Sequence, residues 1–164
     1  MIIIGIDPGL RICGYAIIKS AVSGISLIEA GTIRADVKAQ LAQRLTQIAA
    51  DLDGILDANS PDLVAVEQLY SHYAHPRTAI LMGHARGVIF QRAGARDIKV
   101  VDFSATRIKK SLTGNGRATK EQMQRAIATT LMLKQVPEPA DVADAIAIAL
   151  CCANVHGLGN QRYI

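Results

Sequence analysis

The stretch IIIGID, residues 2–7, decides the fold of this 164-residue chain. Uncharged residues lead directly into Asp7, which is the pattern of a buried strand that ends on an acid. Two more strand patterns follow, in RICGYAIIKS (11–20) and in the alternating ISLIEAGTIR (25–34). The links between these strands are short and contain glycine, so we expect an antiparallel meander.

Beyond the meander, helical and strand patterns alternate. In order, they predict a helix from Lys38 to about Ala58, a strand over 63–68, a helix from Arg77 to Ala93 and a strand over 98–103. Further helices follow, two of them begun by the N-cap residues Ser104 and Thr119. Strands separated by helices pair in parallel through right-handed crossovers. We therefore expect an α/β fold, with a mixed five-stranded sheet (an antiparallel meander plus parallel strands) flanked by helices on both faces.

The composition bounds the class of protein. A hydrophobic content of 50% and a charged content of 20% argue against disorder, and we expect a single domain over 1–157. The short tail 158–164 is a candidate for disorder. Three cysteines, Cys13, Cys151 and Cys152, suggest no disulfide framework, so we interpret them as buried free thiols in a reducing compartment and predict a cytoplasmic location. The apolar runs are too short for a signal peptide or a membrane span.

The net charge of +4 is unevenly distributed along the chain. Residues 104–135 carry seven basic side chains and one acid, which gives +6, whereas the remainder carries 11 basic and 13 acidic residues, which gives −2. One basic segment on an otherwise slightly acidic protein is typical of a nucleic-acid-binding protein. A solvated helical face is the alternative interpretation.

Acids stand at strand ends and at a helix start. Asp7 ends the first strand, Glu67 ends DLVAVEQ, and Asp141 and Asp144 open the apolar helix in EPADVADAIAIALCCA (138–153). Each has an ordinary alternative: an Asp-Pro-Gly turn, the first solvated residue after a strand, or helix-capping carboxylates. If the first strand is central, however, Glu67 lies beside Asp7 at the carboxyl ends of parallel strands, where sites form in such sheets. The last helix could aim its two acids at the same point.

Carboxylates gathered in this way cannot all stay ionised without a compensating cation. Oxygen ligands without histidine or thiolate favour Mg²⁺ over zinc, with Mn²⁺ able to substitute. Such sites use two metal ions to assist in-line phosphodiester hydrolysis. The acids therefore predict a metal-dependent nuclease.

The segments GIDPGLRICGYA, VAVEQLY, LMGHARGVI and ADVADAIAIAL, taken in order, resemble the RuvC-type Holliday junction resolvases over nearly the whole chain. The resemblance implies a ribonuclease H-like fold and a homodimer that uses Mg²⁺ to nick two strands of a four-way DNA junction symmetrically, in recombination and repair. It implies a catalytic, metal-binding tetrad of Asp7, Glu67, Asp141 and Asp144. A RuvA–RuvB branch-migration complex is an expected partner by resemblance only.

The resemblance also implies DNA contacts outside the tetrad. Lys109 and Lys120 match family lysines that contact DNA and support catalysis, and only the register selects Lys109 over the adjacent Lys110. Tyr70 falls where the family often has a phenylalanine that touches bases at the junction centre, and its ring could stack on an unpaired base for about 1–3 kcal/mol. Arg117, in the loop TGNGR, completes the predicted DNA-binding set.

Three other functions are alternatives. A ribonuclease H-like nuclease that acts on RNA, of the ribosomal RNA maturation type, shares the DPG opening, but the VEQ and ADVADA segments fit the resolvases better. A non-catalytic junction-binding protein would keep the basic segment and have no use for the acids. An ATPase of the actin and sugar-kinase type would need a second similar domain and a glycine-rich nucleotide loop.

Gly83 and Gly87 lie four residues apart on a predicted helix, which is unfavourable unless something packs closely there. In the family this helix helps to form the dimer interface, and close helix–sheet packing within one subunit is the alternative. His72 and His75 lie in a loop without a third partner, so we do not expect them to be metal ligands.

Overall fold

The computed structural model describes residues 1–69, 76–135 and 137–156. Its elements are β1 (Ile2–Asp7), β2 (Ile12–Ala21), β3 (Gly24–Arg34), α1 (Leu41–Asn59), β4 (Leu63–Glu67), α2 (Pro76–Gly94), β5 (Lys99–Phe103), α3 (Ala105–Thr113), α4 (Lys120–Thr130) and α5 (Ala140–His156). The predicted order of elements is confirmed, with ends displaced by a few residues. The predictions for Tyr70, His72, His75 and the tail 158–164 lie outside the described residues.

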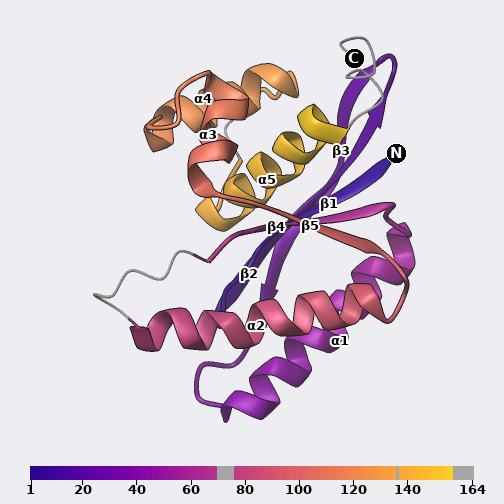
Figure 1. Ribbon diagram of the computed structural model, residues 1–164, viewed down its shortest axis with the longest axis vertical. Coiled ribbons are helices and arrows are strands. Elements are labelled where there is room, and N and C mark those ends of the chain that lie inside the picture. The colour runs from indigo at the N-terminus through magenta and orange to yellow at the C-terminus, as the bar shows by residue number, and fades with distance from the viewer. Residues whose placement is uncertain (70–75, 136, 157–164) are drawn as a thin grey trace.

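The strands form one sheet in the order β3-β2-β1-β4-β5, so β1 is central (Figure 1). The meander pairs antiparallel, whereas β1, β4 and β5 run parallel to one another. Ile6 lies opposite Val66 in the β1–β4 ladder. Asp7 and Glu67, each one residue further on, therefore end neighbouring strands at the same edge of the sheet.

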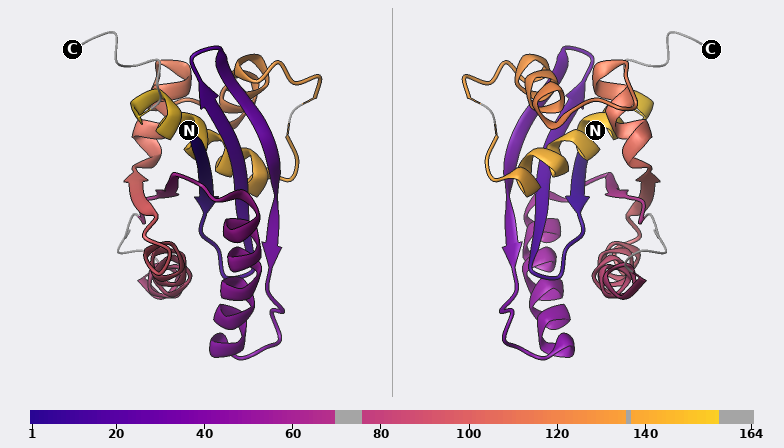
Figure 2. Two further views of the ribbon diagram at one scale, coloured as in Figure 1. Left: turned by 90° about the vertical axis from the view of Figure 1, so that its right-hand side faces the viewer. Right: turned by 90° about the vertical axis from the view of Figure 1, so that its left-hand side faces the viewer.

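Helices cover both faces of this sheet. Figure 1 shows α1 and α2 on one side and α3, α4 and α5 on the other, and Figure 2 shows the same layers from two further directions. Successive strand residues point to opposite faces. Ile3 and Ala65 accordingly pack with the α3–α5 cluster, whereas Ile4 and Val64 pack with the α1–α2 cluster. The hydrophobic core is thus split by the sheet into two layers.

The predicted N-caps are confirmed. The Ser104 hydroxyl accepts a hydrogen bond from the Arg107 N–H at 3.3 Å. The Thr119 hydroxyl accepts one from the Gln122 N–H, and the Gln122 side chain accepts one from the Thr119 N–H at 2.9 Å, which completes a capping box. These caps fix where α3 and α4 begin.

The three cysteines are buried and free, as predicted. In the part of the chain that the structure describes, no helix has both the length and the apolar character needed to cross a membrane.

Candidate active site

The carboxyl ends of β1 and β4 bring two of the predicted acids together. Asp7 and Glu67 are both half-buried where these parallel strands end. Asp7 is also paired across the sheet with Gly14 of β2. The strand order therefore places both carboxylates at one sheet edge, as the sequence predicted.

Two strand glycines set the position of α5. A Cβ on Gly5 would lie 2.3 Å from the carbonyl oxygen of Ala145, and a Cβ on Gly14 would lie 1.9 Å from that of Asp141. Only glycine allows the helix backbone to approach the sheet this closely. Because Gly14 lies opposite Asp7, the contact brings the start of α5, with Asp141, to the acidic edge. These glycines were not among the predicted site residues, although a glycine inside a buried strand is a recognisable signal of close backbone approach.

The two acids of α5 are not simple helix caps. Asp141 lies in the first turn of α5, and Asp144 lies three residues further along the helix. Within the described ranges, the side chains of Asp7, Glu67, Asp141 and Asp144 form no hydrogen bond or ion pair. No capping hydrogen bond therefore accounts for either α5 carboxylate, and of the two only Asp141 lies in the first turn, where the helix dipole favours an acid.

The acids of this cluster raise one another's pKa by electrostatic repulsion. Burial and then the charges of Asp144, Glu67 and Asp141 raise the pKa of Asp7 to about 7. The pKa of Glu67 is also raised, first by burial and then by Asp144. Burial raises the pKa of Asp144 as well, while Lys120 opposes the shift. The cluster thus carries more negative charge than its protein surroundings stabilise.

The described side chains do not by themselves enclose a metal ion, because no three His, Cys, Asp or Glu groups among them converge closely enough. The donor set nevertheless fits a hard divalent cation. It consists of carboxylates without protein partners, and their mutual repulsion is what a bound cation would relieve.

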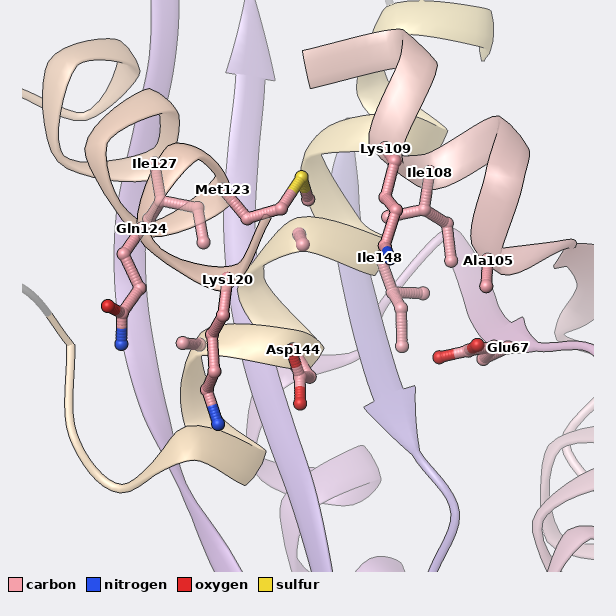
Figure 3. Close-up of a pocket in the computed structure, with 12 residues that line it drawn as sticks. Glu67, Ala105, Ile108, Lys109, Lys120, Met123, Gln124, Ile127, Asp144 and Ile148 are labelled. Carbon is pink, nitrogen blue, oxygen red and sulfur yellow. The ribbon is translucent and has the colours of Figure 1, made fainter. Parts of the chain in front are cut away.

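A cleft of about 320 Å³ adjoins the acids between α3, α4 and α5 (Figure 3). Glu67 and Asp144 line it on one side, and Lys109 and Lys120 reach it from α3 and α4. Figure 3 shows Asp144 between Glu67 and Lys120. Lys109 lowers the pKa of both Glu67 and Asp144, which places its charge near the acids.

The cleft distinguishes among the predicted DNA-binding residues. Lys109 lines it, whereas the adjacent Lys110 is exposed and is not part of its lining. Arg117 is exposed in the loop between α3 and α4 and also lies outside the lining. Gln124, one helical turn after Lys120, lines the cleft and was not predicted.

A polar network supports Glu67 from behind. Arg86 of α2 donates a hydrogen bond to the Glu67 carbonyl at 3.3 Å and forms an ion pair with Asp102 of β5. Gln68 donates to the other oxygen of Asp102 at 2.9 Å. The Arg86 guanidinium also lies 4.5 Å from the centre of the Phe90 ring. The network ties the end of β4 to β5 and α2.

The turn after Asp7 is fixed by a thiol. Cys13 donates a hydrogen bond to the Gly9 carbonyl at 2.7 Å and accepts one from the Gly9 N–H at 3.3 Å. Burial raises the pKa of this thiol to about 11, so it keeps the proton that it donates. The segment between β1 and β2 is thus held in a defined conformation beside the acids.

Comparison with known proteins assigns the family. Residues 3–152 match the family model described as crossover junction endodeoxyribonuclease RuvC. The chain belongs to the RuvC family. A crossover junction endodeoxyribonuclease RuvC from Rhodopirellula baltica is 51% identical over 149 residues, which cover 91% of this chain and 84% of the relative.

Solved RuvC structures agree with this assignment. The Thermus thermophilus RuvC structure has a TM-score of 0.87 at 28% identity, with 94% of each chain covered. T. thermophilus RuvC in complex with a Holliday junction substrate has a TM-score of 0.85 at 25% identity, again with 94% of each chain covered. The predicted resemblance to RuvC-type resolvases and the ribonuclease H-like mixed sheet are confirmed.

Proposed function

We propose that this RuvC-family protein is an endodeoxyribonuclease that resolves four-way DNA junctions by symmetric, paired nicks. The observation that carries the proposal is the meeting of unpaired carboxylates with Lys109 and Lys120 beside one cleft. A protein that only binds junctions would have no use for acids that raise one another's pKa. Membership of the RuvC family supports a junction as the substrate over RNA.

We assign Asp7, Glu67, Asp141 and Asp144 as the ligands of Mg²⁺, with Mn²⁺ able to replace it and two ions per site. Mg²⁺ held there supplies Lewis-acid stabilisation of the charge that develops on the phosphoryl oxygens. The carboxylates contribute an anionic edge that is costly without a cation and favourable with one.

The lysines act on the DNA from the opposite side. The ammonium groups of Lys109 and Lys120 can bind the non-bridging oxygens of a phosphate that lies against the acids, which holds it for in-line attack. The apolar cleft wall formed by Ile108, Ile127 and Ile148 limits the access of water behind this phosphate. Lys110 and Arg117, both exposed, add positive potential that attracts the DNA. The stacking role of Tyr70 stays a prediction.

The outer face of α2 suits a two-fold dimer. Ile80 is 64% exposed and Phe90 is 37% exposed, and these residues share a helical face with Gly83 and Gly87. Among the described atoms, a Cβ on Gly87 would meet nothing within 4 Å, and one on Gly83 would meet only Leu69 at 3.9 Å. Among the described residues, the close helix–sheet contact that would be the alternative within one subunit is therefore absent at these two glycines. We propose that a second copy packs there and supplies the second site that paired nicking needs.

The cytoplasmic location and the RuvA–RuvB partner stay predictions. The first rests on the reduced cysteines and the second on the resemblance alone.

The test of the proposed function is a nicking assay on a synthetic mobile four-way junction with each strand labelled in turn. The protein is incubated with Mg²⁺ or with EDTA, in parallel with linear duplex and an RNA–DNA hybrid. We expect paired symmetric nicks on the junction with Mg²⁺ and none with EDTA. Preferential cleavage of the hybrid would show that the substrate contains RNA and is not a DNA junction. Junction binding without cleavage in Mg²⁺ or Mn²⁺ would show that the protein is not a nuclease.

A further inference from the structure

A second groove opens on the other side of the acidic edge. It has a volume of about 790 Å³ and lies between the β1–β2 turn, the start of α1 and the start of α2. Its walls are largely apolar and include Leu10, Ile12 and Leu81. Asp141 also lines this α1–α2 groove, whereas Glu67 and Asp144 line the cleft beside α3 and α4. The two hollows therefore lie on either side of the acids.

Two arginines line the α1–α2 groove, and neither is neutralised by a carboxylate among the described residues. Arg44 donates one hydrogen bond, from Nη2 to the Leu10 carbonyl. Its Nε is buried and has no acceptor in the described part of the chain. Arg11 is exposed at the same groove. Arg44 therefore uses only one of its five N–H donors within the described residues, and a phosphate is the acceptor that matches the geometry of a guanidinium fork.

We propose that the α1–α2 groove binds one nucleotide of the DNA strand next to the scissile phosphate. Its phosphate would bind Arg11 and Arg44, and its sugar and base would lie against the apolar walls. This inference rests on the proposed nuclease function and deepens it. A strand that crosses the acidic edge then meets cations on both sides, with Lys109 and Lys120 in the cleft and the two arginines in the groove.

The chemistry of the groove favours a nucleotide over an apolar protein segment. A nucleotide presents one anionic group and one flat apolar group, and the groove offers two cations beside an apolar wall. An apolar peptide would exclude water from both guanidinium groups and leave them without a counter-charge.

The test compares Arg11→Gln and Arg44→Gln with a matched control, Lys19→Gln. Lys19 is an exposed cation on β2, paired with Ile2 at the opposite end of the sheet from Asp7. The affinity for a labelled four-way junction is measured by fluorescence anisotropy in EDTA, from about 50 to 200 mM salt. Wild-type cleavage in Mg²⁺ and the thermal unfolding midpoint of each variant are measured in parallel.

We expect each arginine substitution to weaken junction binding roughly 5- to 10-fold near 0.1 M salt and to lower the salt slope by about one. Lys19→Gln should leave both quantities unchanged. Arg11 is exposed and its side chain makes no hydrogen bond or ion pair with the described residues, so Arg11→Gln should keep the wild-type unfolding midpoint. This variant carries the test if Arg44→Gln, which also loses the bond to Leu10, fails to fold.

Several outcomes would overturn the proposal. If the arginine variants keep the wild-type salt slope while the wild-type protein still cleaves junctions, the groove does not bind a nucleotide. The proposed nuclease function would be unaffected, and the apolar groove would bind something else. If Lys19→Gln weakens junction binding as much as the arginine substitutions do, the effect comes from the overall positive charge of the protein and not from the groove. A wild-type protein that neither binds nor cleaves junctions would remove the proposed function, and the subsite with it.

Discussion

Glycines mark two regions of this molecule and do opposite things in them. Gly5 and Gly14 lie beneath α5, where any Cβ would meet the helix backbone at 2.3 Å or less. Gly87, on α2, faces open space among the described atoms. The first region is packed so closely that it sets the position of an acid, and the second leaves a bare surface. The role of a glycine is therefore set by what lies over it, which local sequence does not show.

The largest expected effect is that of Asp7→Asn in the packed region. The substitution removes a proposed metal ligand but leaves the basic surface in place, so cleavage should fall by at least about 1000-fold. Junction affinity in EDTA should stay within about 3-fold of wild type, since no phosphate contact is lost. Nicking and anisotropy assays on the same preparations measure both. Parallel loss of affinity and cleavage would argue that Asp7 supports folding rather than catalysis.

Gly14→Ala should have the next largest effect, on stability. The added Cβ would overlap the Asp141 carbonyl, so α5 must move, and we expect the free energy of unfolding to fall by about 2–4 kcal/mol. Denaturant unfolding measures the loss, with Gly54→Ala on α1 as the control because a Cβ there meets nothing within 4 Å. Equal stability of the two variants would show that α5 does not depend on this close contact.

The contrast also explains how far the sequence could predict the site. The alternation in residues 2–34 and the helix–strand order beyond predicted the mixed sheet. The meeting of Asp7 and Glu67 was predicted on the condition that β1 is central, which the strand order confirms. These features follow from local patterns and from the right-handed crossover. The position of Asp141 could not be predicted as firmly. It depends on how closely α5 approaches Gly14, and residues 14 and 141 are 127 positions apart in the sequence.

The polar support of the site was harder to foresee. Arg86 and Asp102 pair because α2 crosses the end of β5, and nothing in either local segment indicates the partner. Which of Lys109 and Lys110 lines the cleft likewise depends on the rotation of α3 about its axis. Side-chain contacts between elements depend on packing angles, which periodicity does not determine.

Arg86→Gln tests the connection between the two regions, because Arg86 lies on α2 and holds the Glu67 carbonyl. Loss of the ion pair with Asp102 and of this hydrogen bond should lower stability by about 1–2 kcal/mol. Cleavage should fall by roughly 10-fold through a misplaced Glu67, with junction affinity unchanged. Arg86→Lys should recover stability more than cleavage, because it keeps the charge but not the planar fork. If Arg86→Gln loses the expected stability but cleaves as fast as wild type, Arg86 has only a structural role.

The smallest expected effect is that of Gly87→Ala in the open region. Alanine is a better helix former than glycine, so the subunit itself should gain about 0.5–1 kcal/mol. If a second copy packs against this face, the same methyl group should weaken the dimer measurably in sedimentation equilibrium. A more stable subunit with an unchanged dimer would move the interface away from Gly87.

We infer that the carboxylates form one cluster, which is destabilised by its own negative charge until a cation binds. Asp7 has a pKa of about 7 in the folded protein against 3.8 as the ordinary value. The folded state therefore holds a proton that the unfolded state has released between about pH 4 and pH 7, and the stability of the metal-free protein falls as pH rises through this range. Asp7→Asn should not lose stability in this way, because asparagine does not titrate.

The most direct measurement is the unfolding free energy of wild type and Asp7→Asn at pH 8, in EDTA and in millimolar Mg²⁺. We predict that in EDTA the variant is more stable by about 2 kcal/mol, since it no longer carries an unfavourable buried charge. Mg²⁺ should stabilise wild type and leave the variant nearly unchanged, because a ligand stabilises only the folded state that binds it. If the variant is less stable than wild type in EDTA and Mg²⁺ does not stabilise wild type, the carboxylates neither destabilise the fold by their repulsion nor bind the cation.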